Sequence, residues 1–550
     1  MYSYCGFADH SPAEDLNSNN MAYLNSSKYG RVFRILLLLA AIAVLFAIYT
    51  FGIASNPPGF YIDESGFGYN AFLVSRTGAG EFGSPGTIFF QFYTGGFTQY
   101  TSPTLVYMLA AVYWFFGPSI IAARLLTAAS MFTASLLIGG LGARISGRRL
   151  TGIIIGLCAL LTPWLFEVGR LVLDTFFYPM AVILFLWAVY RAYKKDAWTA
   201  VDILLIVLTL ALLTYSYTIG RLLAPLLAFG LIVFATNKKR IIAIAKTWLA
   251  FAVTLVPLIS YIYKNPDFTT RFYLLSYVKP GAPWMDTAQQ FIGRFVEELN
   301  PIQLLWRGDI NPRHHIPDAL GSFYISAYVL AMLGIVVILF RHRRNSWWLY
   351  LIYGLAASIV PGALTVDVSH TLRLIGVPVF LLLLMVPAIE FLVTAAPKAS
   401  AESEGDDEEE VASPMPKSGR AWAIVQPIRY GIIAIILAVM CFEAAYFHKQ
   451  YYLKGPNRGY VFDSAYKELY DAAVAQPVRP IYLVDGYWGP DYIHAFWYAT
   501  VEGRNTGEFI HQPYRLPVPA GSIVISSDRE CIRCEMIRRN GDFILYKTIN

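Results

Sequence analysis

The acidic pair Asp63 and Glu64 is the first place in the sequence where side chains could do chemistry. It lies in the aromatic segment Gly-Phe-Tyr-Ile-Asp-Glu-Ser, residues 59–65, shortly after the first long apolar run. A carboxylate in such a setting can act as a general base, because partial burial raises its pKa toward the working range. A solvated loop acid or a helix N-cap has the same pattern, so the pair alone leaves both interpretations open.

Arg170 and Asp174 form a second candidate group, in the segment Glu-Val-Gly-Arg-Leu-Val-Leu-Asp at 167–174. We expect a membrane helix to begin there, and a spacing of four places both side chains on one helix face. The two residues could be an ion pair that anchors a helix end. They could also point into an outer cavity, as ionisable residues in the membrane zone often do.

His370 and Arg373 form a third group, in Ser-His-Thr-Leu-Arg at 369–373. We expect them to open a helix on the outer side, where an imidazole, a guanidinium and the helix dipole together suit a phosphate. An interfacial arginine that reaches lipid phosphate is the plainer interpretation. Arg221 follows two tyrosines in the segment 215–221 and adds another outer cation.

The elements that must position these residues are apolar helices. The chain has 550 residues, 56% hydrophobic and 15% charged, whereas soluble domains have about 25% charged residues. Because lipid cannot hydrate charge, this composition predicts an all-α polytopic membrane protein. No basic patch with interleaved aromatic residues is present, which argues against a nucleic-acid partner. Eleven apolar runs have the length of a membrane span, namely 33–54, 119–142, 150–166, 171–192, 200–216, 219–236, 246–263, 321–340, 346–363, 371–394 and 421–445.

The sidedness of these spans follows from basic clusters between them. A shorter apolar run, 103–117, begins at Pro103 and ends at Gly117-Pro118. If this run lies along the outer surface as a juxtamembrane helix, the positive-inside rule places every basic cluster in the cytoplasm. All the candidate residues above then face the outer side. The clusters are Lys28/Arg31, Arg144/Arg148/Arg149, Arg191/Lys194/Lys195, Lys238/Lys239/Arg240, Arg341/Arg343/Arg344 and Lys417/Arg420.

This topology predicts the domain organisation. The parts are a cytoplasmic N-terminal tail (1–32), a transmembrane catalytic domain (33–394) with long outer loops 55–118 and 264–320, an acidic solvated linker (395–420), a last span (421–445) and a small outer α/β domain (446–550). In that domain we expect a helix near 463–475 and strands near 481–484, 495–499, 522–525 and 543–546. Cys531 and Cys534 are expected to form a local disulfide. The first thirty residues lack the apolar region of a signal peptide.

Several motifs together resemble the GT-C glycosyltransferases, most closely the branch of protein O-mannosyltransferases and lipid A aminoarabinose transferases. They are Tyr-Ile-Asp-Glu at 61–64, Pro-Thr-Leu-Val-Tyr-Met at 103–108, Phe-Gly-Pro at 116–118, Ala-Arg-Leu at 123–125, Arg170 to Asp174, Tyr-Thr-Ile-Gly-Arg at 217–221 and His370-x-x-Arg373. The resemblance covers most of residues 30–395.

The resemblance implies a polyprenyl-phosphate sugar donor, used on the extracytoplasmic face with inversion at the anomeric carbon. It implies that Asp63, in the pair with Glu64, takes the proton from an acceptor hydroxyl. Cations then stabilise the leaving phosphate. The donor-site residues would be Arg170, Asp174, Arg221, His370 and Arg373.

Cofactor, acceptor and location are less determined. The aminoarabinose transferases carry Glu-Lys-Pro-Pro, whose Glu helps to bind a metal, where this chain has Tyr-Thr-Ser-Pro at 100–103. We therefore assign no metal ligands and leave a divalent cation open. The acceptor could be a protein, a lipid or a glycan. Compact loops favour a bacterial cytoplasmic membrane over the endoplasmic reticulum.

Two other classes of function stay open. A transporter or flippase of lipid-linked sugars usually has paired halves and charges at mid-bilayer, whereas here the charges lie at helix ends and no paired halves are visible. A receptor-like or assembly protein would act through its C-terminal tail and would not need Asp63.

Overall fold

The computed structural model describes residues 28–94, 98–394, 417–486, 489–513, 516–528 and 533–549. Most of the predicted N-terminal tail and acidic linker, and Cys531, lie outside these ranges. The chain separates into two compact units, residues 1–51 and 52–550. In the first unit, α2 (Lys28–Tyr49) is apolar and long enough to cross a membrane, as predicted.

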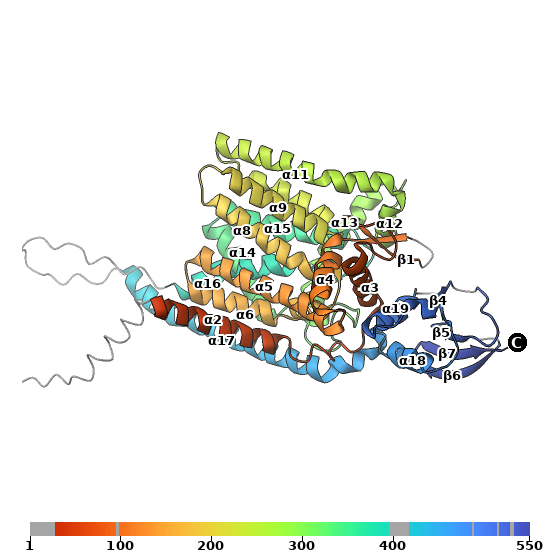
Figure 1. The fold of residues 1–550 in the computed structure, drawn as a ribbon. Helices are drawn as coiled ribbons and strands as arrows, with labels where there is room; N and C mark the ends of the chain where they lie inside the picture. Colours follow the sequence, from red (N-terminus) through yellow and green to blue (C-terminus); the bar gives the residue numbers. More distant parts are fainter. Residues whose placement is uncertain are drawn as a thin grey trace, which may run out of the picture. The chain divides into compact units, whose positions relative to one another are not determined.

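The second unit begins with the elements of the first predicted outer loop. Helix α3 (Ile62–Thr77) is followed by a hairpin of β1 (Phe90–Thr94) and β2 (Thr98–Thr101), and then by α4 (Pro103–Phe116). Proline at the first position and Gly117 after the last residue bound α4, as their types predict. Figure 1 shows α3, α4 and the hairpin together at one end of a larger helix bundle.

Apolar helices build that bundle (Figure 1). Five helices outside the first unit are long and apolar enough to cross a membrane by length and composition, and others in the described chain are shorter but apolar. The elements are α5 (Ile120–Ser146), α6 (Arg149–Leu161), α7 (Pro163–Val168), η1 (Asp174–Phe177), α8 (Tyr178–Tyr193), α9 (Ala200–Ser216), α10 (Gly220–Gly230), η2 (Leu231–Phe234), α11 (Lys238–Lys264), α14 (Ile325–Arg341), α15 (Ser346–Ala363), α16 (Val377–Val393) and α17 (Lys417–Lys454). The predicted polytopic all-α class is confirmed.

The predicted second outer loop contains short helices instead of a structureless chain. It holds η3 (Pro266–Thr269), α12 (Thr270–Leu275), α13 (Trp284–Glu298) and the π-helical turn η4 (Gln303–Arg307). Helix α13 has polar and apolar faces, and only Glu298 among its residues is buried. In Figure 1 these segments lie at the same end of the bundle as α3.

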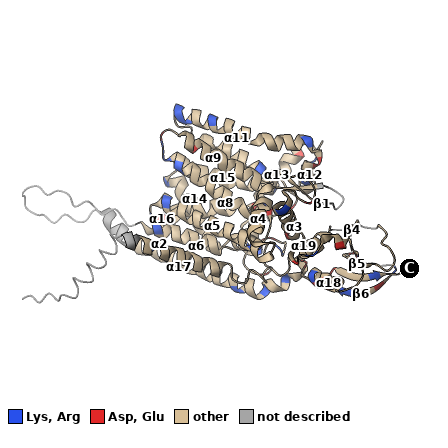
Figure 2. Cartoon of the chain, viewed as in Figure 1, with Lys and Arg blue, Asp and Glu red and all other residues tan. Residues whose placement is uncertain are grey.

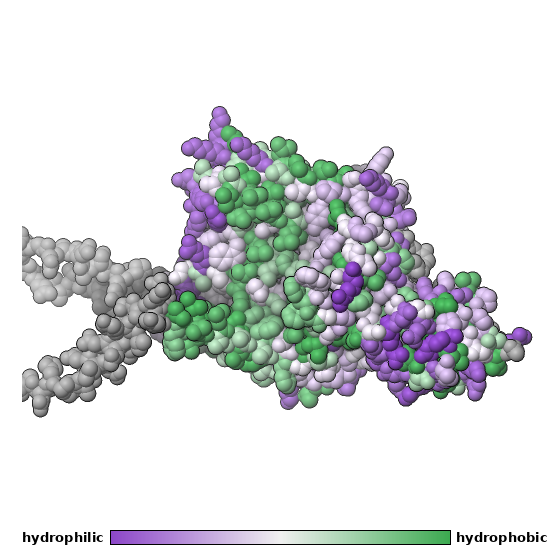
Figure 3. Space-filling model, in the orientation of Figure 1, coloured by the Kyte–Doolittle hydropathy of each residue, from purple (hydrophilic) through white to green (hydrophobic). Residues whose placement is uncertain are grey.

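Residues of several predicted basic clusters form ion pairs and hydrogen bonds at the opposite end of the bundle. Arg148 Nε lies 3.1 Å from Glu390 Oε2, Arg191 Nε lies 3.2 Å from Asp202 Oδ1, and Arg240 Nη2 donates to the Lys195 carbonyl over 2.7 Å. Figure 2 shows basic residues gathered at this end. Between the two ends, Figure 3 shows a hydrophobic band on the visible face of the bundle. The clusters of Arg148, Arg191 and Arg240 therefore share one side of the bundle in the second unit, as the positive-inside argument requires.

The C-terminal region is a small α/β domain, as predicted. After α17 and η5 (Gly455–Val461), α18 (Ser464–Val474) and α19 (Tyr492–Val501) accompany a five-stranded sheet. Its order is β4-β3-β5-β7-β6, with β3 parallel to both β4 and β5 and the remaining pairs antiparallel. The strands are β3 (Ile481–Val484), β4 (Phe509–Gln512), β5 (Ile523–Ser526), β6 (Cys534–Asn540) and β7 (Phe543–Thr548).

One predicted strand of this domain is wrong. Residues 495–499 lie inside α19, although Trp, Tyr and Phe there favour strands in isolation. His494, Trp497 and Tyr498 are buried at helical spacing, so tertiary packing overrides the local preference. The predicted helix and the other three strands are confirmed, and Cys534 is disulfide-bonded.

Candidate functional site

Asp63 lies in the first turn of α3, directly after the point where the helix begins. Glu64 Oε2 accepts a hydrogen bond from Tyr61 N over 2.9 Å, and Asp463 Oδ2 accepts one from Ile62 N over 3.1 Å. These two carboxylates satisfy N–H groups at the helix start that have no partner within the helix. The first turn is therefore held from both sides, and Asp63, the other acid of this turn, lines a cavity.

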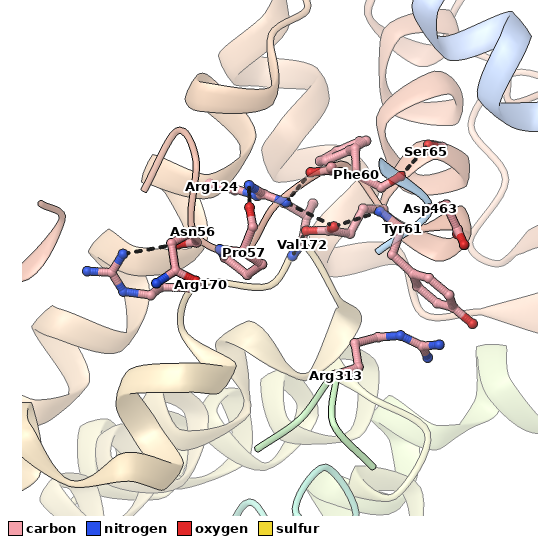
Figure 4. Close-up of polar contacts among 12 residues, drawn as sticks. Asn56, Pro57, Phe60, Tyr61, Ser65, Arg124, Arg170, Val172, Arg313 and Asp463 are labelled. Carbon is pink, nitrogen blue, oxygen red and sulfur yellow. Dashed lines mark hydrogen bonds and ion pairs between the residues drawn. The ribbon is translucent and has the colours of Figure 1, made fainter. Parts of the chain in front are cut away.

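Glu64 has a different environment from its neighbour. Its side chain is 1% exposed, and Oε2 lies 3.3 Å from Arg124 Nη2. Its other oxygen, Oε1, accepts from Val172 N over 3.0 Å. Arg124 in turn donates to the carbonyls of Pro57 and Gly59, each over 2.7 Å. In Figure 4 a dashed line joins Arg124 to Pro57. The contacts favour a structural role for Glu64, in place of the catalytic role that the sequence suggested.

Asp63 and Asp174 line the same small cavity, of about 60 Å³. The polar side chains of its wall include two carboxylates, two guanidinium groups, a phenol and an imidazole. Apart from the two acids, they come from Thr101, Tyr217, Arg271, Arg313 and His314. Two carboxylates with several fixed cations are suited to a reaction in which an anion leaves and a proton is removed.

The walls of this cavity are fixed by neighbouring contacts. Thr101 Oγ1 donates to Asp174 Oδ2 over 3.3 Å, and the Arg313 guanidinium lies 3.3 Å from the centre of the Tyr61 ring. In Figure 4 the Arg313 side chain extends toward that ring. Burial raises the pKa of the Tyr61 hydroxyl, so it stays protonated at neutral pH.

Arg221 lies just outside this wall. Its guanidinium stacks over Phe268 at 4.5 Å and over Phe89 at 5.0 Å from the ring centres. It interacts electrostatically with Asp174 and Arg271, both of which line the cavity. Arg221 therefore contributes positive potential to the cavity without lining it.

Arg170 is not at the cavity, and the predicted shared helix face with Asp174 is wrong. Its fully buried side chain stacks over Phe166 at 4.3 Å, and Nη1 donates to the Asn56 carbonyl over 3.4 Å (Figure 4). The chain at 170–173 runs in turns, and regular α-helix starts only at Tyr178, ahead of Pro179. The reason is that Val172 N donates its hydrogen bond to Glu64 in α3. This stretch therefore connects to α3 and does not form a helix of its own.

His370 and Arg373 precede a helix and do not open it, which corrects the prediction. Helix α16 begins at Val377 with proline in its first turn. Arg373 Nη2 lies 2.6 Å from Asp367 Oδ2, and the His370 ring lies 4.8 Å from that of His314. Burial and the charges of His314 and Arg373 lower the pKa of His370 to about 3. His370 therefore contacts His314, which lines the cavity, and it does not lie at the N-terminus of a helix.

Three residues of the wall were missed at the sequence level: Arg271, Arg313 and His314. All three come from the loop 264–320. Because this loop is long, its sequence does not indicate which of its side chains fold back onto the cavity. The run Asn-Pro-Arg-His-His at 311–315 was the available signal, because cations and imidazoles cluster there on the same predicted side as Asp63.

A larger, mostly apolar cavity of about 280 Å³ lies beside the segment 369–374. Ser369, Thr371 and Leu374 line it, whereas Leu372 lines the cavity of Asp63. Half of its remaining wall comes from α14, α15 and α16, and much of the rest comes from residues 298–308. One acid, Glu298, also lines it and accepts from Ser369 N over 2.9 Å, and burial raises the pKa of Glu298 to about 7. A polar and an apolar cavity therefore share one wall segment.

The C-terminal domain packs directly on α3. Trp497 stacks on Phe60 with ring centres 5.2 Å apart, and a Cβ at Gly68 would lie 2.8 Å from the same indole. Glycine at 68 therefore permits this close approach. Tyr492 also donates a hydrogen bond to Glu81 over 2.7 Å.

Comparison with known proteins decides the fold. No family model and no curated protein matches the sequence. The crystal structure of ArnT from Cupriavidus metallidurans in the apo state matches with a TM-score of 0.51 and 11% identity, over 94% of this chain and 98% of that one. Its complex with undecaprenyl phosphate matches with a TM-score of 0.51 and 12% identity, over the same shares.

The chain has the GT-C fold. The fold expected from the sequence motifs is thereby confirmed. The GT-C likeness extends over nearly the whole chain, so it includes the C-terminal domain, for which the sequence motifs gave no match. Archaeal oligosaccharyltransferase AglB from Archaeoglobus fulgidus, in complex with an inhibitory peptide and a dolichol-phosphate, is also similar, with a TM-score of 0.47 and 12% identity over 91% of this chain and 70% of that one.

Proposed function

We propose that this protein is a membrane glycosyltransferase that moves a sugar from a polyprenyl-phosphate donor to an acceptor hydroxyl. The observation that carries the proposal is the shared cavity of Asp63 and Asp174, with Arg271, Arg313 and His314 in its wall. It combines a candidate base with cations for a leaving phosphate. The GT-C neighbour solved with undecaprenyl phosphate supports a donor of this class.

The adjoining apolar cavity supports a donor with two chemically different ends. The segment 369–374 contributes Leu372 to the cavity that holds the four charged side chains, and Ser369, Thr371 and Leu374 to the larger, mostly apolar cavity. A polyprenyl phosphate has the same arrangement, with an anionic head on an apolar chain. We place the first isoprene units in the apolar cavity, because burial of each CH₂ there is worth about 0.8 kcal/mol.

In the proposed reaction Asp63 takes the proton from the acceptor hydroxyl as its oxygen attacks the anomeric carbon. The bond between that carbon and the phosphate oxygen breaks, and polyprenyl phosphate leaves with the electron pair. Attack opposite the leaving group inverts the anomeric centre. Arg271 and Arg313 are the proposed cations for the departing phosphate, and Arg221 and Arg373 strengthen the positive potential from behind the wall. The reaction takes place on the face of the membrane that holds α3 and the C-terminal domain.

Purified protein in detergent, assayed with a panel of radiolabelled polyprenyl-phosphate sugars, tests the proposal. We expect transfer with at least one donor, and a loss of about 100-fold or more in Asp63→Asn, which keeps the size of the side chain but cannot accept the proton. Glu402→Gln, in the acidic linker, is the control and should transfer normally. Full transfer by Asp63→Asn would overturn the assignment of the base.

A further inference from the structure

Three side chains with metal-ligand chemistry meet beside the cavity of Asp63. Asp309 and His314 come from the connection between α13 and α14, and His370 comes from the connection between α15 and α16. One ligand atom from each lies within 4.8 Å of the others. The cluster is therefore assembled from distant parts of the chain by the fold.

The first two members are buried and held in place. The side chains of Asp309 and His314 are 2% and 5% exposed, with Asp309 Oδ2 3.1 Å from His314 Nδ1. The same oxygen accepts from the backbone N and from Oγ1 of Thr371, each over 2.8 Å. Asp309 Oδ1 accepts from Asn311 N over 2.9 Å. These contacts orient the carboxylate in the way that outer-shell partners orient a metal ligand.

The loop that carries His314 is anchored independently. The neighbouring His315 lies with Nδ1 2.7 Å from Glu167 Oε2, and Glu167 Oε1 accepts from Ile316 N over 2.9 Å. The other ring nitrogen of His315, Nε2, lies 2.6 Å from the Leu320 carbonyl oxygen, so both nitrogens have partners, whereas His314 lines the cavity. The position of His314 does not depend on Asp309 alone.

The third member has an unused buried atom. Among the described residues, Nδ1 of His370 is buried and has no hydrogen-bond partner, although its ring lies 4.8 Å from that of His314. A buried polar atom without a partner costs about 1–3 kcal/mol, so native proteins rarely keep one without a reason. A ligand bond to an ion would supply the missing partner.

We propose that Asp309, His314 and His370 bind one transition-metal dication, with Zn²⁺ as the best fit. Two imidazoles and one carboxylate are ligands that zinc uses when three protein groups leave a position open. Mg²⁺ and Ca²⁺ prefer all-oxygen sites and fit this set poorly. Asp309 and His314 are already close enough for bonds of about 2.0–2.2 Å to one ion, and the ring of His370 has to move toward them.

The location gives the ion access to the reaction cavity. His314 lines the same wall as Asp63 and Asp174, so the open position can be reached by an oxygen of a phosphate or hydroxyl placed there. The metal site itself rests on the three side chains and not on the proposed transfer reaction. Binding can therefore be measured on a protein that shows no activity.

The test uses the full chain, purified in detergent with a tag free of histidine and stripped with EDTA. Calorimetric titration with ZnCl₂ and metal analysis after dialysis should give one zinc per chain, and MgCl₂ should give no comparable binding. Substitution of Co²⁺ should produce the visible bands of a four-coordinate site.

His370→Ala should weaken zinc binding more than about 100-fold, which exceeds the effect of losing an outer-shell partner. This variant removes a side chain with an unused Nδ1, so it tests the site even if His314→Ala fails to fold. His342→Ala is the matched control, since this histidine is exposed at the C-terminal end of α14. No zinc on the wild type, or the same affinity in His370→Ala, would overturn the proposal.

Discussion

The Ser65 hydroxyl lies 2.9 Å from Nδ1 of His494, a residue 429 positions later in the chain. Both side chains are fully buried, and the other ring nitrogen of His494 lies 3.2 Å from Asp463 Oδ2. The same Asp463 oxygen accepts from Ile62 N. The C-terminal domain therefore contacts the residue before Asp63 and a residue shortly after it. We infer that these contacts position Asp63.

We expect His494→Ala to lower kcat about 10-fold with little change in KM for the donor. Loss of the contact lets the first turn of α3 shift, and displacements of this kind cost rate when the reacting atoms no longer align. Steady-state kinetics over a range of donor concentrations measures the split. Glu535→Ala, on an exposed strand of the same domain, is the control. An unchanged kcat, or a change in KM alone, would contradict the positioning role.

Substitutions of the adjacent acids Asp63 and Glu64 should have opposite effects on stability and on transfer. Glu64→Gln leaves Arg124 buried without its anion and should lower the free energy of unfolding by about 3–5 kcal/mol. Asp63→Asn should leave stability nearly unchanged and remove transfer. Thermal unfolding in detergent and the transfer assay, applied to both variants, separate the two roles. If Glu64→Gln were as stable as the wild type and inactive, Glu64 would be a catalytic residue instead.

The burial of Glu81 beside Tyr492 should make stability depend on pH. Burial raises the pKa of Glu81 to about 7, above the value in the unfolded chain. The folded protein therefore binds more protons than the unfolded chain between about pH 4.5 and pH 7, so stability falls as pH rises through this range.

Replacement of the titrating group tests this dependence. Glu81→Gln keeps an oxygen that accepts from Tyr492 but carries no proton to lose. Relative to the wild type it should gain about 1–3 kcal/mol at pH 8 and little at pH 5. Melting temperatures from pH 5 to pH 8 give the comparison, with the exposed Glu535→Gln as the control. Parallel curves for wild type and Glu81→Gln would show that Glu81 does not titrate in this range.

Gly334 allows α14 and α16 to pack in direct backbone contact. A Cβ at this position would lie 1.8 Å from the Leu384 carbonyl oxygen, so Gly334→Ala must separate the two helices. We expect a loss of about 1–3 kcal/mol in stability. Gly431→Ala in α17 is the matched control, because its Cβ would meet nothing within 4 Å. It should be neutral or slightly stabilising, since alanine favours helix. Equal melting temperatures for the two variants would argue against the close contact.

Apolar runs and basic clusters in the sequence predicted the helices, because a segment that crosses lipid must be apolar along its length and polar residues must lie at its ends. Pro103 and Gly117 marked the ends of α4 for local steric reasons. The sequence also predicted that Asp63, Asp174 and His370 lie on one side of the membrane. That information is local, and each segment carries it by itself.

Only the tertiary structure decided which of these polar residues meet. Asp63 and Glu64 are neighbours in sequence, yet one lines the cavity and the other braces Arg124. Arg170 has the positive charge that could bind a phosphate, but it lies among aromatic rings. Arg313 and His314 line the cavity, although they come from a loop without a regular sequence pattern. The reason is that side-chain roles here depend on contacts between segments far apart in the chain, and no local spacing encodes those contacts.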